Sequence, residues 1–280
     1  MKIFNKIPEI KEYLLLQKIH DLKIGFIPTM GTLHSGHLSL IERAKEDNLL
    51  CVCSIFINPL QFNNKKDLAN YPKSLESDII KLDSVSCDVL FAPSEKEMYP
   101  KKENTIYDFG GLDKYMEGAF RPGHFNGVAI VVKKLFDIIE PHKAYFGEKD
   151  FQQLAIIKNL VKKYHIPVEI ISCPTIREDD GLAMSSRNIR LLPAERKAAP
   201  LIYKTLYKAK EMARTSSIEE IKKWVTNEIK KNSLFKLEYF EIVDCESLKP
   251  VNDLNGHEKC IACIASYLGN VRLIDNIKFL

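Results

Sequence analysis

Two histidines follow an apolar run at the point where a helix is expected to begin. His34 and His37 lie in the segment MGTLHSGH, residues 30–37. Because residues three apart share one face of a first helical turn, we expect the two imidazoles to lie together. A helix N-terminus offers unpaired backbone N–H groups to an anion, and imidazoles there can hydrogen-bond phosphate oxygens as charge builds during phosphoryl transfer. Helix capping or core packing is the alternative role for this pair.

A second polar group follows another apolar run, in FGEKDFQQL, residues 146–154. The ammonium of Lys149 can meet a phosphate, Asp150 can bond a ribose hydroxyl, and the amide of Gln153 can both donate and accept. A capped helix on the surface is the alternative. The sequence contains no Gly-x-x-x-x-Gly-Lys-Ser/Thr segment, which excludes a P-loop kinase or ATPase.

Three loops carry the remaining candidates. AMSSRN, residues 183–188, places two hydroxyls beside an arginine, which suits a mobile loop that closes over a triphosphate, although a polar linker is the alternative. FINPLQFN, residues 56–63, places Gln61 directly after an apolar run. EGAFRPGHFNG, residues 117–127, is broken by Gly and Pro, and a surface turn is its alternative.

Short apolar runs alternate with helical periodicity through the first 175 residues, which indicates a parallel sheet wrapped by helices. LLCVCSIFI is nearly continuous, as expected for a strand covered on both faces. In such sheets, ligands bind at the carboxyl ends of the strands. We expect strands at residues 23–29, 49–57, 87–92, 143–146 and 168–173, and helices from about residue 36 and at 71–84, 127–139 and 151–164.

The pattern changes after Pro174 and predicts a smaller α+β domain, with the boundary near residues 174–190. A polar stretch leads into two segments with apolar residues at helical spacing, which include Ile202 and Ile218. Three strand-like runs follow, at residues 235–243, 260–268 and 271–274.

Six of these segments together resemble the pantoate–β-alanine ligase family, the pantothenate synthetases. They are, in order, PTMGTLHSGHLSLI, FINPLQF, YPKSLESD, GAFRPGHFNGVA, AYFGEKDFQQL and PTIREDDGLAMSSRN. The His-x-Gly-His motif alone would indicate only the wider nucleotidyltransferase superfamily, whereas the series is specific. The resemblance is dense over residues 24–192 and looser beyond. Ser35 stands where the family often has Glu, and Lys73 where it often has Arg.

The resemblance implies a cytoplasmic homodimeric ligase that uses ATP to join (R)-pantoate to β-alanine, a step in the synthesis of a coenzyme A precursor. Pantoate attacks the α-phosphate to give pantoyl adenylate and pyrophosphate, and β-alanine then displaces AMP. Magnesium should be carried on the ATP phosphates without a protein ligand, although Asp78 resembles a family aspartate near that ion. The implied fold is a Rossmann-like domain, residues 1–175, and a smaller α+β lid domain, residues 176–280.

The resemblance also implies the site residues. His37 matches the proposed proton donor, and His34 and Lys149 are expected to act with it in catalysis. Gln61 and Gln153 match the glutamines that hold pantoate, with Gln61 also near β-alanine. The expected ATP-binding residues are Met30, Gly31, Thr32, Leu33, His34, Ser35, Gly36, His37, Gly147, Glu148, Lys149, Asp150, Ile176, Met184, Ser185, Ser186 and Arg187.

Two alternative functions remain at this point. Another adenylyltransferase of the superfamily would share the histidines, but its phosphate acceptor would require Arg or Lys in place of the paired glutamines. An RNA-binding module would use residues 190–240, where 12 Lys/Arg stand against 6 Asp/Glu. A solvated helical surface explains that excess equally, and the net charge of +4 for the whole chain does not require a nucleic-acid partner.

Composition and cysteine usage are those of an ordinary globular protein. The 280 residues are 45% hydrophobic and 28% charged, which excludes a disordered or low-complexity chain. The apolar runs fall short of the ~20 residues that a membrane span needs, and the N-terminal segment does not resemble a signal peptide. The C-x-x-C of Cys260 and Cys263 lacks a second ligand pair nearby, so we expect buried strand thiols in a reducing, cytoplasmic protein.

Overall fold

The computed structural model describes residues 1–47, 49–72, 74–254 and 259–279, so Lys73 lies outside the described residues. These residues form two compact units, each with a hydrophobic core of its own. Unit 1 comprises residues 1–110, 121–148 and 153–174, and unit 2 comprises residues 111–120, 149–152 and 175–280. None of the described helices is long and apolar enough to cross a membrane.

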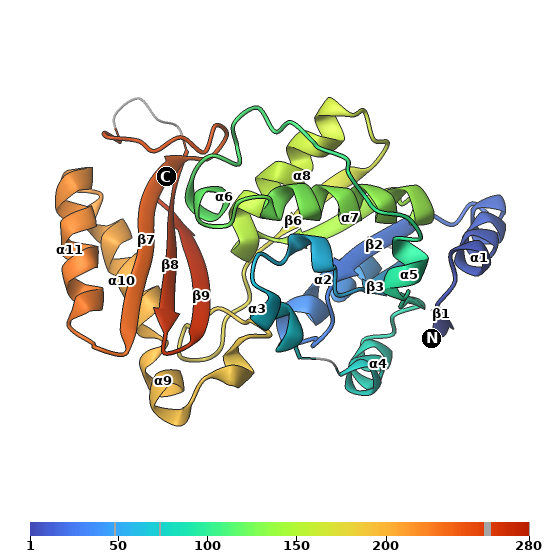
Figure 1. Ribbon diagram of the computed structural model, residues 1–280, viewed down its shortest axis with the longest axis horizontal. Helices are drawn as coiled ribbons and strands as arrows, with labels where there is room; N and C mark the ends of the chain where they lie inside the picture. The colour runs from blue at the N-terminus through green and yellow to red at the C-terminus, as the bar shows by residue number, and fades with distance from the viewer. Residues whose placement is uncertain (48, 73, 255–258, 280) are drawn as a thin grey trace. The chain divides into compact units, whose positions relative to one another are not determined.

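Unit 1 is built on a six-stranded parallel sheet with helices on both faces (Figure 1). Four of the six residues of its β3 strand, LCVCSI, are buried, as the continuous apolar run predicted. The expected α/β class is therefore confirmed. The strands are β1 (Lys2–Phe4), β2 (Ile24–Thr29), β3 (Leu50–Ile55), β4 (Val89–Phe91), β5 (Lys143–Gly147) and β6 (Glu169–Cys173).

The order in which the chain adds strands to this sheet reverses at β2. The strand order is β1-β4-β3-β2-β5-β6, so the chain passes from β2 to β3 and β4 on one side and later to β5 and β6 on the other. Because these strands are parallel, the carboxyl ends of β2, β3 and β5 share one edge. A switch point of this kind is where open α/β sheets bind ligands.

Helices cover the two faces of the sheet through separate apolar clusters. Ile10 of α1 and Val131 of α7 pack with Phe26 on one face, while Ile41 of α2 and Leu82 of α4 pack on the other. The helical segments are α1 (Ile7–Ile19), α2 (Ser35–Glu46), η1 (Pro59–Gln61), α3 (Lys65–Ala69), α4 (Leu75–Ser84), α5 (Glu95–Met98), α7 (His124–Ile139), η2 (Glu148–Asp150) and α8 (Phe151–Lys163), of which η2 and α8 include residues of unit 2.

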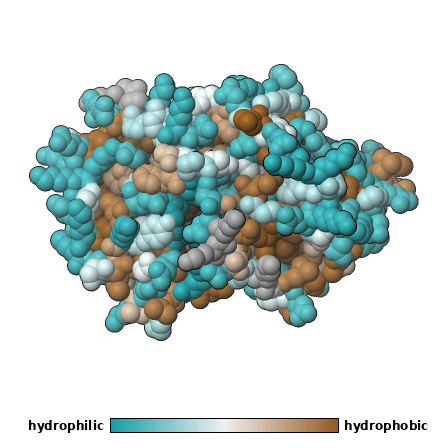
Figure 2. Space-filling view, viewed as in Figure 1, coloured by the Kyte–Doolittle hydropathy of each residue, from teal (hydrophilic) through white to brown (hydrophobic). Residues whose placement is uncertain are grey.

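Apolar periodicity did not reveal the first of these helices. Ile10 and Leu14 of α1 are buried, but Leu15, Leu16 and Ile19 are exposed, at 60%, 50% and 68%. Figure 2 shows hydrophobic residues at the right edge of the view, where Figure 1 places α1. An apolar stripe on both sides of a helix removes the amphipathic pattern by which a helix is recognised.

Unit 2 is an antiparallel three-stranded sheet covered by helices, as the smaller α+β pattern predicted. Val225 and Ile229 of α11 pack with Ile264 of β8 in its core. Cys260 and Cys263 are buried on β8, which confirms the interpretation of the C-x-x-C segment as strand thiols. The elements are α6 (Met116–Phe120), η3 (Asn188–Arg190), α9 (Pro193–Ala198), α10 (Leu201–Met212), α11 (Ile218–Lys230), β7 (Phe235–Asp244), β8 (Cys260–Leu268) and β9 (Val271–Lys278).

Candidate active site

A buried carboxylate fixes the loop between β2 and α2. Gly31 has φ of +82°, a conformation that favours glycine, and a Cβ at this residue would lie 3.0 Å from the side chain of Ile55. Asp78 of α4 is fully buried, and its two oxygens accept the backbone N–H groups of Thr32 and Leu33, each at 2.7 Å. The conformation of this loop therefore depends on a residue more than 40 positions away in the sequence.

The same contacts show that Asp78 does not fit a magnesium ligand. Both of its oxygens are occupied by backbone donors, and the ammonium of Lys81 already lies 4.0 Å from one of them. Each oxygen keeps a second lone pair, but Asp78 has no solvent exposure, so the water ligands that magnesium usually keeps have no access to it. Within the described part of the chain, no group of three or more His, Cys, Asp or Glu residues is placed to hold a metal ion.

The two histidines cap α2 through their Nδ1 atoms. Nδ1 of His34 accepts the backbone N–H of Gly36 at 3.2 Å, and Nδ1 of His37 accepts the backbone N–H of His34 at 3.3 Å. The ring centroids lie 4.0 Å apart. A neutral imidazole that accepts through Nδ1 carries its proton on Nε2, so Nε2 is the nitrogen that can donate to a ligand. Capping and donation, which the sequence presents as alternatives, use different atoms of each ring.

Gln61 is the last residue of η1, which follows β3, and it is held beside the β2–α2 loop. Its side-chain nitrogen donates to the sulfur of Met30 at 3.0 Å, and its side-chain oxygen accepts from the amide of Asn58 at 3.0 Å. Tyr99 in turn donates its hydroxyl to the Asn58 oxygen at 2.8 Å, and burial raises the pKa of Tyr99, which keeps the donor protonated. Sequence reasoning missed Asn58, although an Asn before Pro is a signal for a turn or cap.

The backbone of Gln61 is fixed from the other side by α7. Gly127 packs so closely on η1 that a Cβ would lie 2.3 Å from the carbonyl oxygen of Leu60. Nδ1 of His124 lies 2.8 Å from the Gln61 carbonyl oxygen, which can only accept, so this Nδ1 carries a proton. Arg121 donates to the same oxygen at 3.4 Å. The loop with this arginine and histidine thus supports Gln61.

The end of β5 adds Gly147 and Glu148 at the same sheet edge, because β5 pairs with β2. The next residue, Lys149, belongs to unit 2, and 18% of its side chain is exposed. Its ammonium lies 3.7 Å from the carboxylate of Asp150. An ammonium with a weak, partly exposed partner keeps donors that a phosphate can use.

The two neighbouring glutamines of α8 have different surroundings. Gln152 is 4% exposed and donates to the carbonyl oxygens of Leu112 and Tyr115 at 2.8 and 2.9 Å. Gln153 is half-buried. The amide of Gln152 is therefore used in tethering residues 111–120, which sequence reasoning did not detect.

Ile176 and the candidates of the loop at residues 183–188 lie in unit 2. Met184 donates its backbone N–H to the carbonyl oxygen of Ile176 at 3.0 Å, which brings these two together. Ser185 accepts the backbone N–H of Arg187 at 3.2 Å and so turns the chain at this point. Ser186 and Arg187 are half-buried in the same turn. This turn is rich in donors and positive charge.

Comparison with known proteins gives consistent matches over the full chain. The sequence model of the family described as pantoate-beta-alanine ligase matches residues 2–278. The chain is 47% identical over 279 residues to the pantothenate synthetase of Bacteroides fragilis, with 100% of this chain and 99% of that protein covered. It is 49% identical over 274 residues to the pantothenate synthetase of Christiangramia forsetii, with 95% and 97% covered.

Solved structures of the same family are also similar. The crystal structure of pantothenate synthetase from Thermus thermophilus has a TM-score of 0.91 and 40% identity, with 100% of this chain and 99% of that chain covered. The crystal structure of pantoate-beta-alanine ligase from Francisella tularensis, complexed with beta-gamma ATP and beta-alanine, has a TM-score of 0.82 and 39% identity, with 100% and 98% covered.

Proposed function

Because the chain belongs to the pantoate–β-alanine ligase family, we propose that its reaction runs through pantoyl adenylate and depends on the residues described above. The chain is an ATP-dependent ligase that joins pantoate to β-alanine to form pantothenate. In the first step, a carboxylate oxygen of (R)-pantoate attacks the α-phosphorus of ATP, and the bond to pyrophosphate breaks. In the second step, the β-alanine amine attacks the acyl carbon, AMP leaves with its bonding electrons, and the nitrogen loses a proton to solvent.

The first step needs charge neutralisation and alignment rather than a general base, because the pantoate carboxylate is already ionised near neutral pH. Charge builds on the α-phosphate oxygens and on the departing pyrophosphate. His37 and His34 meet this need with their Nε2–H donors at the start of α2, with His37 as the proton donor. The backbone of residues 30–37 holds ATP at the same helix terminus.

Lys149 supplies the cation for the same step. Its ammonium stabilises the pyrophosphate leaving group more than the ground state, because negative charge increases there as the bond breaks. Residues 147–150, Ile176 and residues 184–187 complete the proposed ATP set.

Gln61 and Gln153 hold pantoate, and Gln61 also approaches β-alanine. An uncharged amide can donate to a carboxylate and accept from a hydroxyl, which suits a hydroxy acid. The hydrogen bonds of Asn58 and Met30 to Gln61 favour one orientation of its amide, so the site is preorganised for that substrate.

The contact of Gln61 with Met30 carries this proposal, because it brings a proposed pantoate residue against a proposed ATP residue within unit 1. The test is product analysis with ATP, pantoate and β-alanine, each omitted in turn. We expect AMP, pyrophosphate and pantothenate only from the complete mixture. Formation of ADP and phosphate would overturn the adenylate route.

Several properties extend the proposal beyond the site residues. Magnesium enters with the phosphates of ATP as part of the substrate, which is supported by the occupied oxygens of Asp78. Residues 1–175 bind nucleotide and pantoate, and residues 176–280 act as the lid.

The protein works as a homodimer, which light scattering would test. It works in the reducing cytoplasm, which is supported by seven free cysteines, six of them buried.

A further inference from the structure

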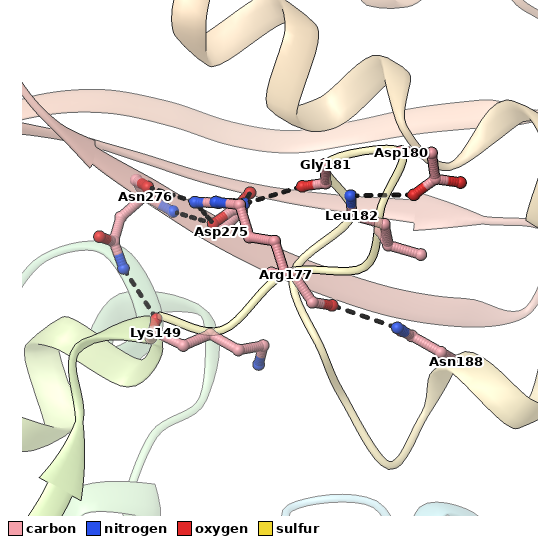
Figure 3. A network of polar contacts seen from close by, with 9 residues as sticks. Lys149, Arg177, Asp180, Gly181, Leu182, Asn188, Asp275 and Asn276 are labelled. Carbon is pink, nitrogen blue, oxygen red and sulfur yellow. Dashed lines mark hydrogen bonds and ion pairs between the residues drawn. The ribbon is translucent and has the colours of Figure 1, made fainter. Parts of the chain in front are cut away.

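A polar network in unit 2 connects the backbone of Lys149 to the C-terminal strand β9 (Figure 3). The side-chain amide of Asn276 donates to the carbonyl oxygen of Lys149 at 2.8 Å. Asn276 is 8% exposed, so solvent competes little for this hydrogen bond. The lysine side chain runs away from Asn276, and its ammonium lies outside the hydrogen bonds of the network (Figure 3).

Asn276 is itself held by a buried ion pair. Asp275 is 4% exposed and accepts from both terminal nitrogens of Arg177, at 2.6 and 3.0 Å. Asp275 also accepts the backbone N–H of Asn276 at 2.8 Å, while Arg177 donates to the Asn276 carbonyl oxygen at 3.3 Å. Desolvation offsets much of the attraction in a buried ion pair. This bidentate pair therefore contributes more to the orientation of the two side chains than to the stability of the fold.

The other end of the network fixes the loop with the proposed phosphate-binding serines. Arg177 donates to the carbonyl oxygen of Gly181 at 3.1 Å and lies over the ring of Tyr203 at 3.9 Å. Asn188, the last residue of the loop at 183–188, donates a hydrogen bond from its side-chain amide to the carbonyl oxygen of Ala183 at 3.1 Å. The arginine that orients Asp275 thus holds the chain at Gly181, and the Asn188 hydrogen bond closes residues 183–188 on themselves.

We propose that Asn276 is a positioning residue for adenylation, held by the Arg177–Asp275 pair and acting through the backbone of Lys149. This inference rests on the proposed role of Lys149 in binding the ATP phosphates. Asn276 need not touch substrate: its amide sets the path of the chain at residue 149 and therefore the origin of the lysine side chain. The same pair holds the chain at Gly181, shortly before the serines of residues 183–188.

The expected effect is selective for one half-reaction. A displacement of about 1 Å at a charged group can lower a rate by about 100-fold, so loss of this hydrogen bond should impair the step that needs Lys149. Amide formation from pantoyl adenylate no longer involves pyrophosphate and should be nearly unchanged. General damage to unit 2 would affect the two steps equally.

The test is a double-mutant cycle with a core variant as control. Asn276→Ala, Lys149→Ala and the double variant are compared with wild type for affinity toward a non-hydrolysable ATP analogue, by calorimetry. Asn276→Asp keeps the shape but replaces the donor with an acceptor, so it should behave like the alanine variant. Val225→Ala opens a cavity in the core of unit 2 without removing a hydrogen bond of this network, and it reports what lost stability alone does.

We expect Asn276→Ala to weaken the affinity for the analogue about 10-fold in the wild-type background and to change it little when Lys149 is already alanine. It should lower pantoate-dependent ATP–pyrophosphate exchange and spare amide formation from synthetic pantoyl adenylate, while Val225→Ala lowers stability with normal half-reactions. Equal losses in both backgrounds or in both half-reactions would overturn the inference. Normal affinity and exchange in Lys149→Ala alone would instead overturn the proposed function of that lysine.

Discussion

Nδ1 of His37 accepts the backbone N–H of His34 at 3.3 Å, and the two ring centroids lie 4.0 Å apart. The hydrogen bond attaches the proposed proton donor to the residue that caps α2. It also determines the orientation of the ring and leaves the proton of a neutral His37 on Nε2. Structural and chemical roles therefore fall on opposite nitrogens of one side chain, and substitutions can separate them.

Replacement of His37 should separate turnover from stability. The Oδ1 of His37→Asn lies near the position of Nδ1 and keeps the cap, whereas the Nε2 of His37→Gln lies near the position of the imidazole Nε2 and keeps the donor. We expect His37→Asn to lose at least ~100-fold in kcat, as does His37→Ala, because one preorganised donor is removed. His37→Gln should keep more turnover and lose about 1 kcal/mol of unfolding free energy with the cap.

Steady-state kinetics and urea unfolding of the three variants measure these two effects. If His37→Asn keeps near-normal turnover, Nε2 has no part in the mechanism.

Gln153→Ala should raise KM for pantoate far more than KM for ATP. A site built to hydrogen-bond a hydroxyl discriminates strongly, and the loss falls on the substrate that the amide holds. Gln152→Ala is the matched control, because this neighbour donates only to the backbone of Leu112 and Tyr115 in the described structure. It should lose about 1–3 kcal/mol of stability without a preference for pantoate. Equal rises of both KM values in Gln153→Ala would make that residue structural.

Asp78→Asn distinguishes a loop-fixing carboxylate from a metal ligand. An asparagine can accept one of the two N–H groups of Thr32 and Leu33, but its NH₂ faces the other. We expect about 1–3 kcal/mol less stability and a higher KM for ATP, with no change in the free Mg²⁺ concentration for half-maximal activity. Titration of Mg²⁺ at fixed ATP measures this quantity. A higher Mg²⁺ concentration for half-maximal activity in a folded Asp78→Asn variant would show that Asp78 does act as a magnesium ligand.

The stability of unit 1 should depend on Asp47 at low pH. The hydroxyl of Tyr145, which donates at 2.7 Å, and the ammonium of Lys143 hold the pKa of Asp47 well below its usual value of 3.8. A lowered folded-state pKa contributes stability that is complete above about pH 4 and is lost as pH falls below it. Tyr145→Phe returns this pKa toward its usual value, so its stability deficit should shrink between pH 7 and pH 3.

Urea unfolding at pH 7, 5 and 3 measures the deficit. Tyr207→Phe, at an exposed tyrosine of α10, is the control and should show a pH-independent difference. A deficit in Tyr145→Phe that stays constant with pH would show that the Tyr145 hydroxyl does not lower the pKa of Asp47.

The strand pattern of unit 1 could be predicted because strands buried on both faces carry their signal locally. LLCVCSIFI needs no partner to be recognised as a covered strand, and β3 begins and ends within it. The helix α1 was missed because it is apolar on more than one face. The edge strand β1 was missed because its three mostly exposed residues carry no buried apolar run.

The site was predictable only where one short segment carries the chemistry. The capping pair His34 and His37 belongs to such a segment. The contacts of Asp78 with Thr32 and of Asn276 with Lys149 join residues 46 and 127 positions apart, and nothing local in the sequence encodes them. Resemblance supplied a metal role for Asp78 that its hydrogen bonds do not fit.

The most direct measurement of the central claim is ATP–pyrophosphate exchange without β-alanine, compared with amide formation from synthetic pantoyl adenylate, in wild type and Lys149→Ala. We expect wild-type exchange to require pantoate and not β-alanine, because the adenylate forms before the amine takes part. Lys149→Ala should lose nearly all exchange and keep much of the second reaction, because the charge it neutralises leaves with pyrophosphate. Exchange that requires β-alanine, or equal losses of both reactions in the folded variant, would contradict the account.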